Sequence, residues 1–310
     1  MTAPSARTLV VGEALIDIVI GADHQDEHVG GSPANVAMGL ARLGHPTDLL
    51  AHIGTDQRGR RISEHVAATG VRLVPGSDTA DHTPTATARL DEQGAATYDF
   101  DLPWDIPAVD RAGASHVHAG SIAATLEPGA SRVRELLQQS RAEATISYDP
   151  NLRPSIMGEP HDVRSLVEEL VGLADVVKTS DEDLAWLYAG TSVPEIAHLW
   201  GRLGPSVVVV TQGPDGALVH LSGNGEDTVA PATPASVVDT VGAGDSFMAG
   251  LLSGLLDAGL LGDPGARERL RGSQLDGILP AVRRALDAAH WTIERAGAAA
   301  PTRSDLSATR

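Results

Sequence analysis

The segment Asp239–Gly250, DTVGAGDSFMAG, carries the clearest signal for chemistry in this chain. Gly242, Ala243 and Gly244 are small residues that precede an apolar stretch of helical period. Small residues let backbone amides approach a ligand closely, and a helix N-terminus adds partial positive charge. Asp245 stands beside this predicted anion hole. Phosphoryl transfer needs this pairing, since donors stabilise the moving phosphate while a carboxylate accepts the hydroxyl proton. An ordinary helix start with a favourable Asp245 is the alternative interpretation.

Two further segments have residue types that suit a sugar and a nucleotide. The stretch Gly30–Gly44 begins with Gly30 and Gly31, which permit close approach, and Asn35 can both donate and accept hydrogen bonds as a sugar hydroxyl requires. The turn Thr211–Gly216, TQGPDG, follows four consecutive valines. Glycine-rich turns at the carboxyl ends of buried strands bind nucleotides in α/β sheets. A plain helix start and a plain turn remain the alternatives.

The elements that must position these residues alternate between two kinds. Short apolar runs predict buried strands at Thr8–Val11, Leu49–Ile53, Ser115–His118, Thr145–Tyr148, Val176–Lys178 and Val207–Thr211. Segments of helical period predict helices at Ala34–Leu43, Gly59–Thr69, Ser131–Arg141, Val163–Leu173, Asp181–Tyr188, Ser246–Leu261 and Leu275–Arg295. This alternation predicts an α/β fold with a mostly parallel central sheet flanked by helices on both faces.

Two segments depart from this rhythm and alternate like antiparallel strands. Asp17–Val29 and Thr85–Phe100 each hold two short runs around a polar turn, the second turn being Glu-Gln-Gly. They predict a small β lid, segments of about 17–30 and 83–103, inserted in a single domain of residues 1–310; a decorative hairpin is the alternative. The small, polar tail 299–310 is expected to fray.

Composition narrows the function classes. The 310 residues carry 23 basic and 41 acidic side chains, a net charge of −18, which disfavours nucleic acid and anionic membranes as partners. The absence of cysteine excludes disulfides, thiolate metal sites and a cysteine nucleophile. No apolar run has membrane-spanning length, and MTAPSARTLV lacks the long apolar stretch of a signal peptide. We therefore expect a cytoplasmic protein.

The three glycine-containing segments together resemble the ribokinase-like (PfkB-type) carbohydrate kinases over nearly the whole chain. GG-x-x-x-N at 30–35 is similar to the first motif of that family, and D-T-V-G-A-G-D at 239–245 to the second. The resemblance implies a ribokinase-like fold, a β lid, ATP and a divalent metal such as Mg²⁺. It leaves open whether a monovalent cation such as K⁺ also binds.

The resemblance also implies roles for matching residues. It makes Asp245 the base, and Gly242, Ala243 and Gly244 the anion hole. The further residues expected to bind ligands are, for the sugar, Asp17, Gly30, Gly31 and Asn35 and, for the nucleotide, Thr211, Gly213, Gly216, Ala288 and Ala289.

Within this family the sequence is most similar to fructokinases. The similar segments are Tyr98–Phe100, Ala119–Ser121, Tyr148–Pro154 and Val177–Leu184. Arg153 matches an arginine near the sugar and phosphate, and Tyr98 and Phe100 are expected on the lid above the sugar. The resemblance implies fructose as acceptor and fructose 6-phosphate as product, with 2-keto-3-deoxygluconate or ribose as alternatives. Only nine aromatic residues disfavour a nucleoside, which needs an aromatic base sandwich.

The segment Ser180–Asp183 departs from the family, where many members have N-x-x-E. We expect Asp183 to reach the metal through water, and the alternative is a helix cap formed by Ser180. His116 and His118 lie on one face of a predicted strand and are a candidate metal pair, although no third ligand is evident. Lining of the sugar pocket by His118, or a place in the core, is the favoured interpretation.

Rival classes fail on particular residues. A P-loop kinase needs Gly-Lys-Ser/Thr, but the only lysine, Lys178, follows Val177. A Rossmann dehydrogenase needs G-x-G-x-x-G after its first strand, where this chain has Gly12-Glu13-Ala14. A sugar-binding module without catalysis remains the alternative from another class. An exposed lid edge would allow a homodimer through the lid.

Overall fold

The computed structural model describes residues 6–21, 25–90, 96–111 and 113–308. Its main sheet has nine strands in the order β13-β12-β11-β10-β9-β8-β1-β4-β5. In chain order the strands are β1 Thr8–Val11, β4 Thr47–Leu50, β5 Arg72–Leu73, β8 His116–Gly120, β9 Thr145–Asp149, β10 Val176–Ser180, β11 Val207–Thr211, β12 Ala217–Leu221 and β13 Glu226–Ala230. The neighbouring pairs from β5 to β11 are parallel, and β12 and β13 add antiparallel strands at one edge. The predicted mostly parallel sheet is confirmed.

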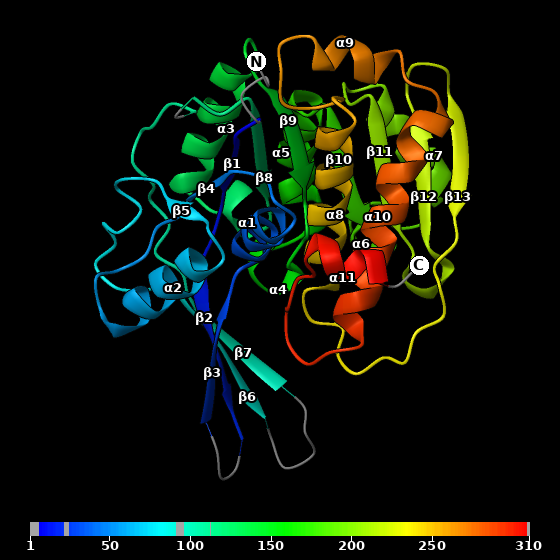
Figure 1. Cartoon of the computed structure of the whole chain (residues 1–310). Helices are drawn as coiled ribbons and strands as arrows, with labels where there is room; N and C mark the ends of the chain where they lie inside the picture. The colour runs from blue at the N-terminus through cyan, green and yellow to red at the C-terminus, as the bar shows by residue number, and fades with distance from the viewer. Residues whose placement is uncertain (1–5, 22–24, 91–95, 112, 309–310) are drawn as a thin grey trace.

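Helices cover both faces of this sheet (Figure 1). They are α1 Ser32–Arg42, α2 Gln57–Ala68, α3 Gly129–Ser140, α4 Pro154–Met157, α5 Pro160–Leu173, α6 Asp181–Leu187, α7 Val193–Gly201, α8 Ala243–Asp257, α9 Ala266–Arg271, α10 Leu275–Ile293 and α11 Arg303–Ala308. One core joins α1, α8 and α10 to the sheet, and a second core joins α3, α5, α6 and α7 to the opposite face. None of the described helices is long and apolar enough to cross a membrane.

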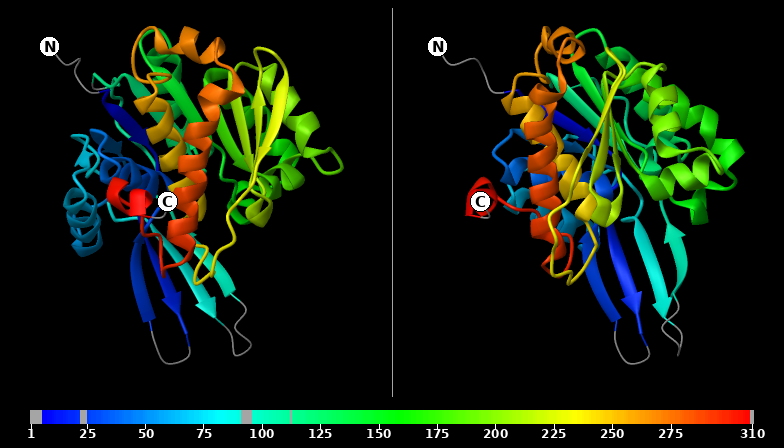
Figure 2. Two further views of the ribbon diagram at one scale, coloured as in Figure 1. Left: turned by 45° about the vertical axis from the view of Figure 1, so that its right-hand side comes forward. Right: turned by 90° about the vertical axis from the view of Figure 1, so that its right-hand side faces the viewer.

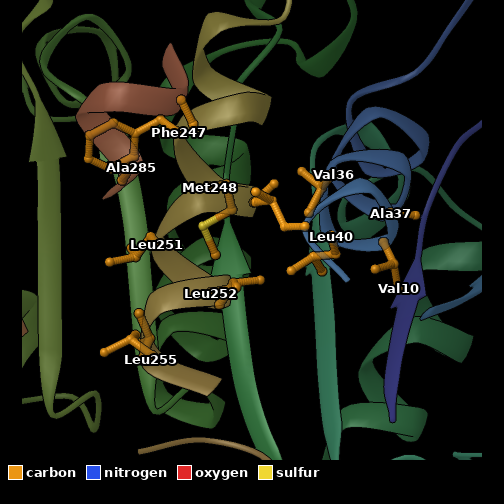
Figure 3. Close-up of a cluster of buried hydrophobic side chains, with 14 of the residues drawn as sticks. Val10, Val36, Ala37, Leu40, Phe247, Met248, Leu251, Leu252, Leu255 and Ala285 are labelled. Atoms are coloured by element: carbon orange, nitrogen blue, oxygen red, sulfur yellow. The ribbon is translucent and has the colours of Figure 1, made fainter. Parts of the chain in front are cut away.

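Alternation along the strands explains why two cores form. Val10 belongs to the core with α1 and α8, whereas its neighbours Leu9 and Val11 belong to the other. In the first core, Val36 and Leu40 of α1 face Met248 and Leu252 of α8 (Figure 3). This packing brings two helices together that are two hundred residues apart in the sequence.

Small residues set the distance between α8 and α10. A Cβ at Gly250 would lie 2.8 Å from Ala285 Cα, and a Cβ at Gly254 would lie 2.5 Å from Ala281 Cα. Both distances are too short for a side chain, so glycine permits the two helix backbones to approach closely. The close packing fixes where the N-terminus of α8 meets the sheet.

The two predicted ribbons are present and join into one four-stranded sheet. Its strands are β2 Leu15–Ile20, β3 Gln25–Gly30, β6 Thr85–Leu90 and β7 Ala96–Asp101, in the order β3-β2-β6-β7. Both hairpins are antiparallel, and β2 pairs with β6 in parallel. The predicted turns, including Glu-Gln-Gly, lie outside the described residues. Figures 1 and 2 show this sheet, the lid, projecting from the main body.

Several elements differ from the sequence-based expectation. The strands β12 and β13 and the helix α7 were not predicted, because their runs are short and interrupted by polar residues. The tail was expected to fray, yet its last described residues form α11. Leu306 is 9% exposed, and the guanidinium of Arg303 donates to Asp257 Oδ1 at 2.9 Å and to the backbone carbonyl of Leu43. These contacts anchor the C-terminal end to α1 and α8.

Candidate active site

The predicted anion hole lies at the N-terminus of α8. Gly242 precedes the helix in the left-handed region, with φ 75°, and a Cβ there would lie 2.5 Å from Ala298 Cβ. Glycine is therefore required both by the backbone conformation and by the close approach of the chain. Ala243 and Gly244 begin the helix, and Asp245 lies in its first turn. The free amides of this turn point toward the space that Asp245 borders.

Asp245 is held by the first turn of α1. Ser32 Oγ donates to Asp245 Oδ1 at 2.6 Å, and Asn35 Nδ2 donates to Asp245 Oδ2 at 2.8 Å. The two glycine motifs of the sequence therefore meet in space through this carboxylate. Asn35 Oδ1 is buried and has no partner among the described residues, which leaves one acceptor for a ligand. The contribution of Ser32 was not predicted.

A cavity of ≈ 630 Å³ lies between the main sheet and the lid. Most of the predicted site residues line it, together with Glu13 and Lys178. The predicted residues in its wall are Asp17, Gly31, Asn35, Phe100, Arg153, Asp183, Thr211, Gly213, Gly242, Gly244 and Asp245. A second cavity under the lid shares Asp17, Asn35, Phe100 and Arg153 with it and is also lined by Gly30 and Tyr98.

Asp17 on β2 and the glycines after β3 form the base of the lid. A Cβ at Gly30 would lie 1.9 Å from Asp17 Oδ2, so glycine leaves room for that carboxylate. Gly31 has φ 106°, and a Cβ there would lie 2.4 Å from the Glu13 carbonyl oxygen. Burial raises the pKa of Asp17 to about 6; the neighbouring charge of Asp245 also raises it, while His28 and Arg153 act against the shift.

A buried ion pair lies beside the anion hole and was missed from the sequence. Lys178 Nζ on β10 donates to Asp149 Oδ2 on β9 at 3.0 Å, with the two side chains 5% and 2% exposed. A Cβ at Gly244 would lie 3.1 Å from Lys178 Nζ, which places this ammonium against the first turn of α8. Burial lowers the pKa of Lys178, but Asp149, Asp183 and Asp245 outweigh it and keep that pKa above its usual value. A lone lysine at the carboxyl end of a predicted strand was the available signal.

Glu13, at the carboxyl end of β1, is a second residue that the sequence interpretation missed. Its carboxylate accepts a hydrogen bond from the Ala123 amide at 3.3 Å and also one from Ser121. Burial raises its pKa to about 7. The carboxyl ends of neighbouring parallel strands therefore supply Glu13, Asp149 and Lys178 to one edge of the sheet, where α/β proteins bind ligands.

Asp183 takes part in both geometries proposed for it. Ser180 and Asp183 form a capping box at the start of α6, with Asp183 N donating to Ser180 Oγ at 3.0 Å. Asp183 Oδ1 also accepts from the Leu152 amide at 3.0 Å, and the residue lines the cavity. Asp149 Oδ1 is buried without a partner among the described residues. These carboxylate oxygens are ligands of the kind that Mg²⁺ prefers.

Arg153 follows β9 and borders the cavity with an exposed side chain. Its Nη1 donates to Asn151 Oδ1 at 2.8 Å, and Asn151 itself has a left-handed backbone with φ 38°. The guanidinium is therefore directed by the strained turn after the strand and keeps further donors free for a ligand.

The nucleotide residues are only partly brought together. Thr211 and Gly213 line the cavity, and Thr211 Oγ1 donates to the Thr179 carbonyl at 3.2 Å. Gly216 packs against β13, since a Cβ there would lie 2.1 Å from the Ala230 carbonyl oxygen. Ala288 is fully buried in the core beneath α10, and Ala289 is partly buried beside it. Gly216, Ala288 and Ala289 do not line the cavity.

His116 and His118 are core residues. His116 is hydrogen-bonded with Thr145 Oγ1 at 2.9 Å and Ser147 Oγ at 3.0 Å, and His118 is hydrogen-bonded with Ser147 Oγ at 2.9 Å. Burial lowers the pKa of both imidazoles, to about 4 and about 3. Neither lines the cavity, so the placement of His118 in the sugar pocket was wrong and its alternative, a place in the core, holds.

Comparison with known proteins supports the same class. The sequence profile of the "pfkB family carbohydrate kinase" matches residues 6–305. The chain is 36% identical to a fructokinase of Klebsiella pneumoniae over 273 residues, covering 83% of this chain and 86% of that protein. It is 32% identical to a fructokinase of Salmonella typhimurium over 281 residues, covering 85% and 89%.

A solved structure has the same fold. A double-mutant fructokinase of Vibrio cholerae O395, with fructose, ADP and a potassium ion bound, superposes with a TM-score of 0.81 at 27% identity, covering 99% of both chains. The likeness includes the large sheet, its helices and the lid. The chain therefore belongs to the pfkB family of carbohydrate kinases.

Proposed function

We propose that this protein transfers the γ-phosphate of ATP to the primary 6-hydroxyl of fructose and forms fructose 6-phosphate. The observation that carries the proposal is the position of Asp245, whose carboxylate lies between the first turns of α1 and α8 and borders the cavity. A carboxylate there can take the proton of a hydroxyl whose oxygen faces the anion hole. A binding module would not need this pairing.

The proposed step forms one bond and breaks one. The sugar oxygen attacks the γ-phosphorus, the bond from that phosphorus to the bridging oxygen of ADP breaks, and the hydroxyl proton moves to Asp245. The amides of Gly242, Ala243 and Gly244 hold the phosphate oxygens, and Lys178 adds a cation on the same side. Arg153 supplies a second positive charge from the opposite wall.

The sugar is proposed to lie under the lid. Asp17 accepts hydrogen bonds from two hydroxyls, and Asn35 offers its unpaired Oδ1 to another donor. Gly30 and Gly31 leave room for the ring, while Phe100 and Tyr98 of β7 cover it; their rings stack with centroids 6.0 Å apart. Exclusion of water by this cover limits hydrolysis of ATP.

The nucleotide and its cations are proposed from the remaining wall. Thr211 and Gly213 border the phosphates, and Gly216 supports their loop; contact of Ala288 and Ala289 with adenine stays a prediction. Asp149 and Asp183 would hold Mg²⁺ directly or through water, and the ion would neutralise charge on the phosphates. A K⁺ site is proposed only because the Vibrio cholerae enzyme was solved with that ion. A kinase needs a supply of ATP, so the proposed location is the cytoplasm.

A panel of acceptors in a coupled ADP-release assay tests the function. Fructose is expected to give the highest kcat/KM, because both curated relatives compared above are fructokinases. The panel includes 2-keto-3-deoxygluconate and ribose. A much higher kcat/KM for either would refute fructose and keep the kinase class. Sugar binding without ADP release for any acceptor would favour a binding module.

A further inference from the structure

Three side chains that can ligate a metal converge at the edge of the main sheet, away from the cavity. His198 lies on α7, His220 on β12 and Asp227 on β13. His198 Nε2 lies 2.7 Å from Asp227 Oδ2, and His220 Nδ1 lies 2.7 Å from Asp227 Oδ1. The three ligand atoms lie within 4.8 Å of one another, and no other group of this kind occurs in the described part of the chain.

The fold builds this cluster from three separate elements. The antiparallel register of β12 and β13 pairs His220 directly with Asp227, and α7 packs over β12 and brings His198 above them. Gly201 ends α7 at this point, and a Cβ there would lie only 2.6 Å from His220 Nε2. Glycine at this position therefore makes room for the buried imidazole.

Burial divides the cluster into one fixed ligand and two accessible ones. The side chain of His220 is 5% exposed, whereas those of His198 and Asp227 are 43% and 31% exposed. An ion can therefore enter from solvent, and a water can occupy a fourth position. The two imidazole rings lie with centroids 4.5 Å apart, on the same side of the carboxylate.

The geometry suits a tetrahedral ion with nitrogen and oxygen ligands. Bonds of about 2.0 Å in a tetrahedron place ligand atoms about 3.3 Å apart, so the present 2.7 Å contacts need to open by only about half an ångström. Two imidazoles and one carboxylate with an open position are typical of zinc. Mg²⁺ prefers oxygen ligands alone, so this cluster differs in chemistry from the nucleotide cation site.

We propose that His198, His220 and Asp227 bind a zinc-class divalent ion that ties β12 and β13 to α7. The bound ion fixes the edge strand of the sheet. The other end of β13 carries Ala230, whose carbonyl packs against Gly216 of the predicted nucleotide loop. Binding of the ion therefore stabilises the edge strand that supports this loop, without contributing a ligand to the cavity.

The test uses the full-length protein after treatment with EDTA and transfer to metal-free buffer. Zn²⁺ binding is measured by calorimetry, and Co²⁺ binding by its visible absorption, which no thiolate can produce because the chain lacks cysteine. The variants are His198→Asn and Asp227→Asn. The matched control is His161→Asn, since His161 is a 77% exposed histidine that pairs with Asp162 at 3.0 Å.

We expect one ion per wild-type chain, an affinity at least about tenfold lower in both variants, as loss of metal-site interactions typically causes, and no change in the control. Zn²⁺ should raise the melting temperature of wild type and control only. Melting in EDTA shows whether each variant is folded. Equal affinity in all four proteins, or no stoichiometric binding to wild type, would overturn the proposal and leave the cluster as hydrogen bonds alone.

Discussion

Asp245 owes its place to side chains from another helix. Ser32 and Asn35 each donate to one of its oxygens, so the carboxylate is oriented before any substrate binds. Lys178 lies on the other side of Gly244 and is itself held by Asp149. The proposed base and the proposed cation are therefore both fixed by partners, which is the preorganisation that phosphoryl transfer requires.

The substitution Asp245→Asn should remove the base and keep the shape. The new amide would offer one acceptor and one donor, and Asn35 can turn its own amide because its Oδ1 is unpaired among the described residues. We expect kcat to fall by roughly 10²–10⁴-fold, the usual worth of general base catalysis, with little change in binding. Steady-state kinetics and calorimetric titration with ATP and sugar check this. Near-normal kcat in a folded variant would refute the base assignment.

Replacing Lys178 with Met should lower kcat by roughly 10²–10³-fold, the usual loss when one transition-state donor is removed. The same change leaves Asp149 buried and unpaired, which costs about 3–5 kcal/mol of unfolding free energy. The double variant Lys178→Met with Asp149→Asn separates the two effects. It should recover much of the stability, measured by urea unfolding, while kcat stays low. Recovery of kcat together with stability would show that Lys178 is only structural.

Asp17 should give the sugar response an acidic limb. Its pKa is raised to about 6, and only the ionised carboxylate accepts two hydroxyl hydrogen bonds. As pH falls through about 6, kcat/KM for the sugar should therefore fall, and Asp17→Asn should have a higher sugar KM without this limb. Because the pKa exceeds 3.8 in the folded state, Asp17 lowers the unfolding free energy as pH rises from 3.8 to about 6. An unchanged pH profile in Asp17→Asn would count against this role.

The start of α6 combines a structural and a functional use of one turn. The capping box formed by Ser180 and Asp183 satisfies amides that the helix leaves free. Asp183 also holds the Leu152 amide, which fixes the segment that carries Arg153. The turn thus joins the helix start to the wall of the cavity.

Replacing Asp183 with Ala should lower the unfolding free energy by about 0.5–2 kcal/mol, since a cap is lost. If Asp183 also orders the waters of Mg²⁺, the concentration of Mg²⁺ needed for half-maximal activity should rise. Thermal melting and a magnesium titration measure the two effects separately, with Asp183→Asn as the variant that keeps an acceptor oxygen. A lower melting temperature with an unchanged magnesium curve would eliminate the metal role.

The molecule as a whole consists of a layered body and a lid that continues from it. β2 follows β1 after a short turn, and β3 leads directly into α1, so lid and site share one backbone. We propose that residues 1–310 act as one kinase domain for this reason. The lid sheet has two edge strands, β3 and β7, which are free to pair outside this chain in the described arrangement.

We propose a homodimer through the lid, because Tyr98 on β7 is 58% exposed and exposed sheet edges pair readily. Tyr98→Lys should shift the protein toward monomer and raise the sugar KM, since a charged side chain opposes burial. Light scattering after size exclusion, at several concentrations, measures the state. Arg132→Ala, on exposed α3, is the control. A wild-type monomer at every concentration would refute the dimer.

The sequence was sufficient for features that depend on local pattern. The alternation of apolar strands and helices predicted the sheet, since a residue's period follows from its own neighbours. The Gly242–Asp245 run predicted a helix start beside a carboxylate for the same reason. By contrast, β12 and β13 were missed, because their pairing lies at the sheet edge and their sequences carry His220 and Asp227 among apolar residues.

Only the tertiary structure decided which distant residues share one wall. Ser32 and Asn35 meet Asp245 because α1 and α8 pack on the same core, a contact that spans more than two hundred positions. Lys178 looked like an absent P-loop lysine until neighbouring parallel strands placed it against Gly244. Strand order and helix packing are set by burial of surfaces far apart in the chain, and no local pattern records them.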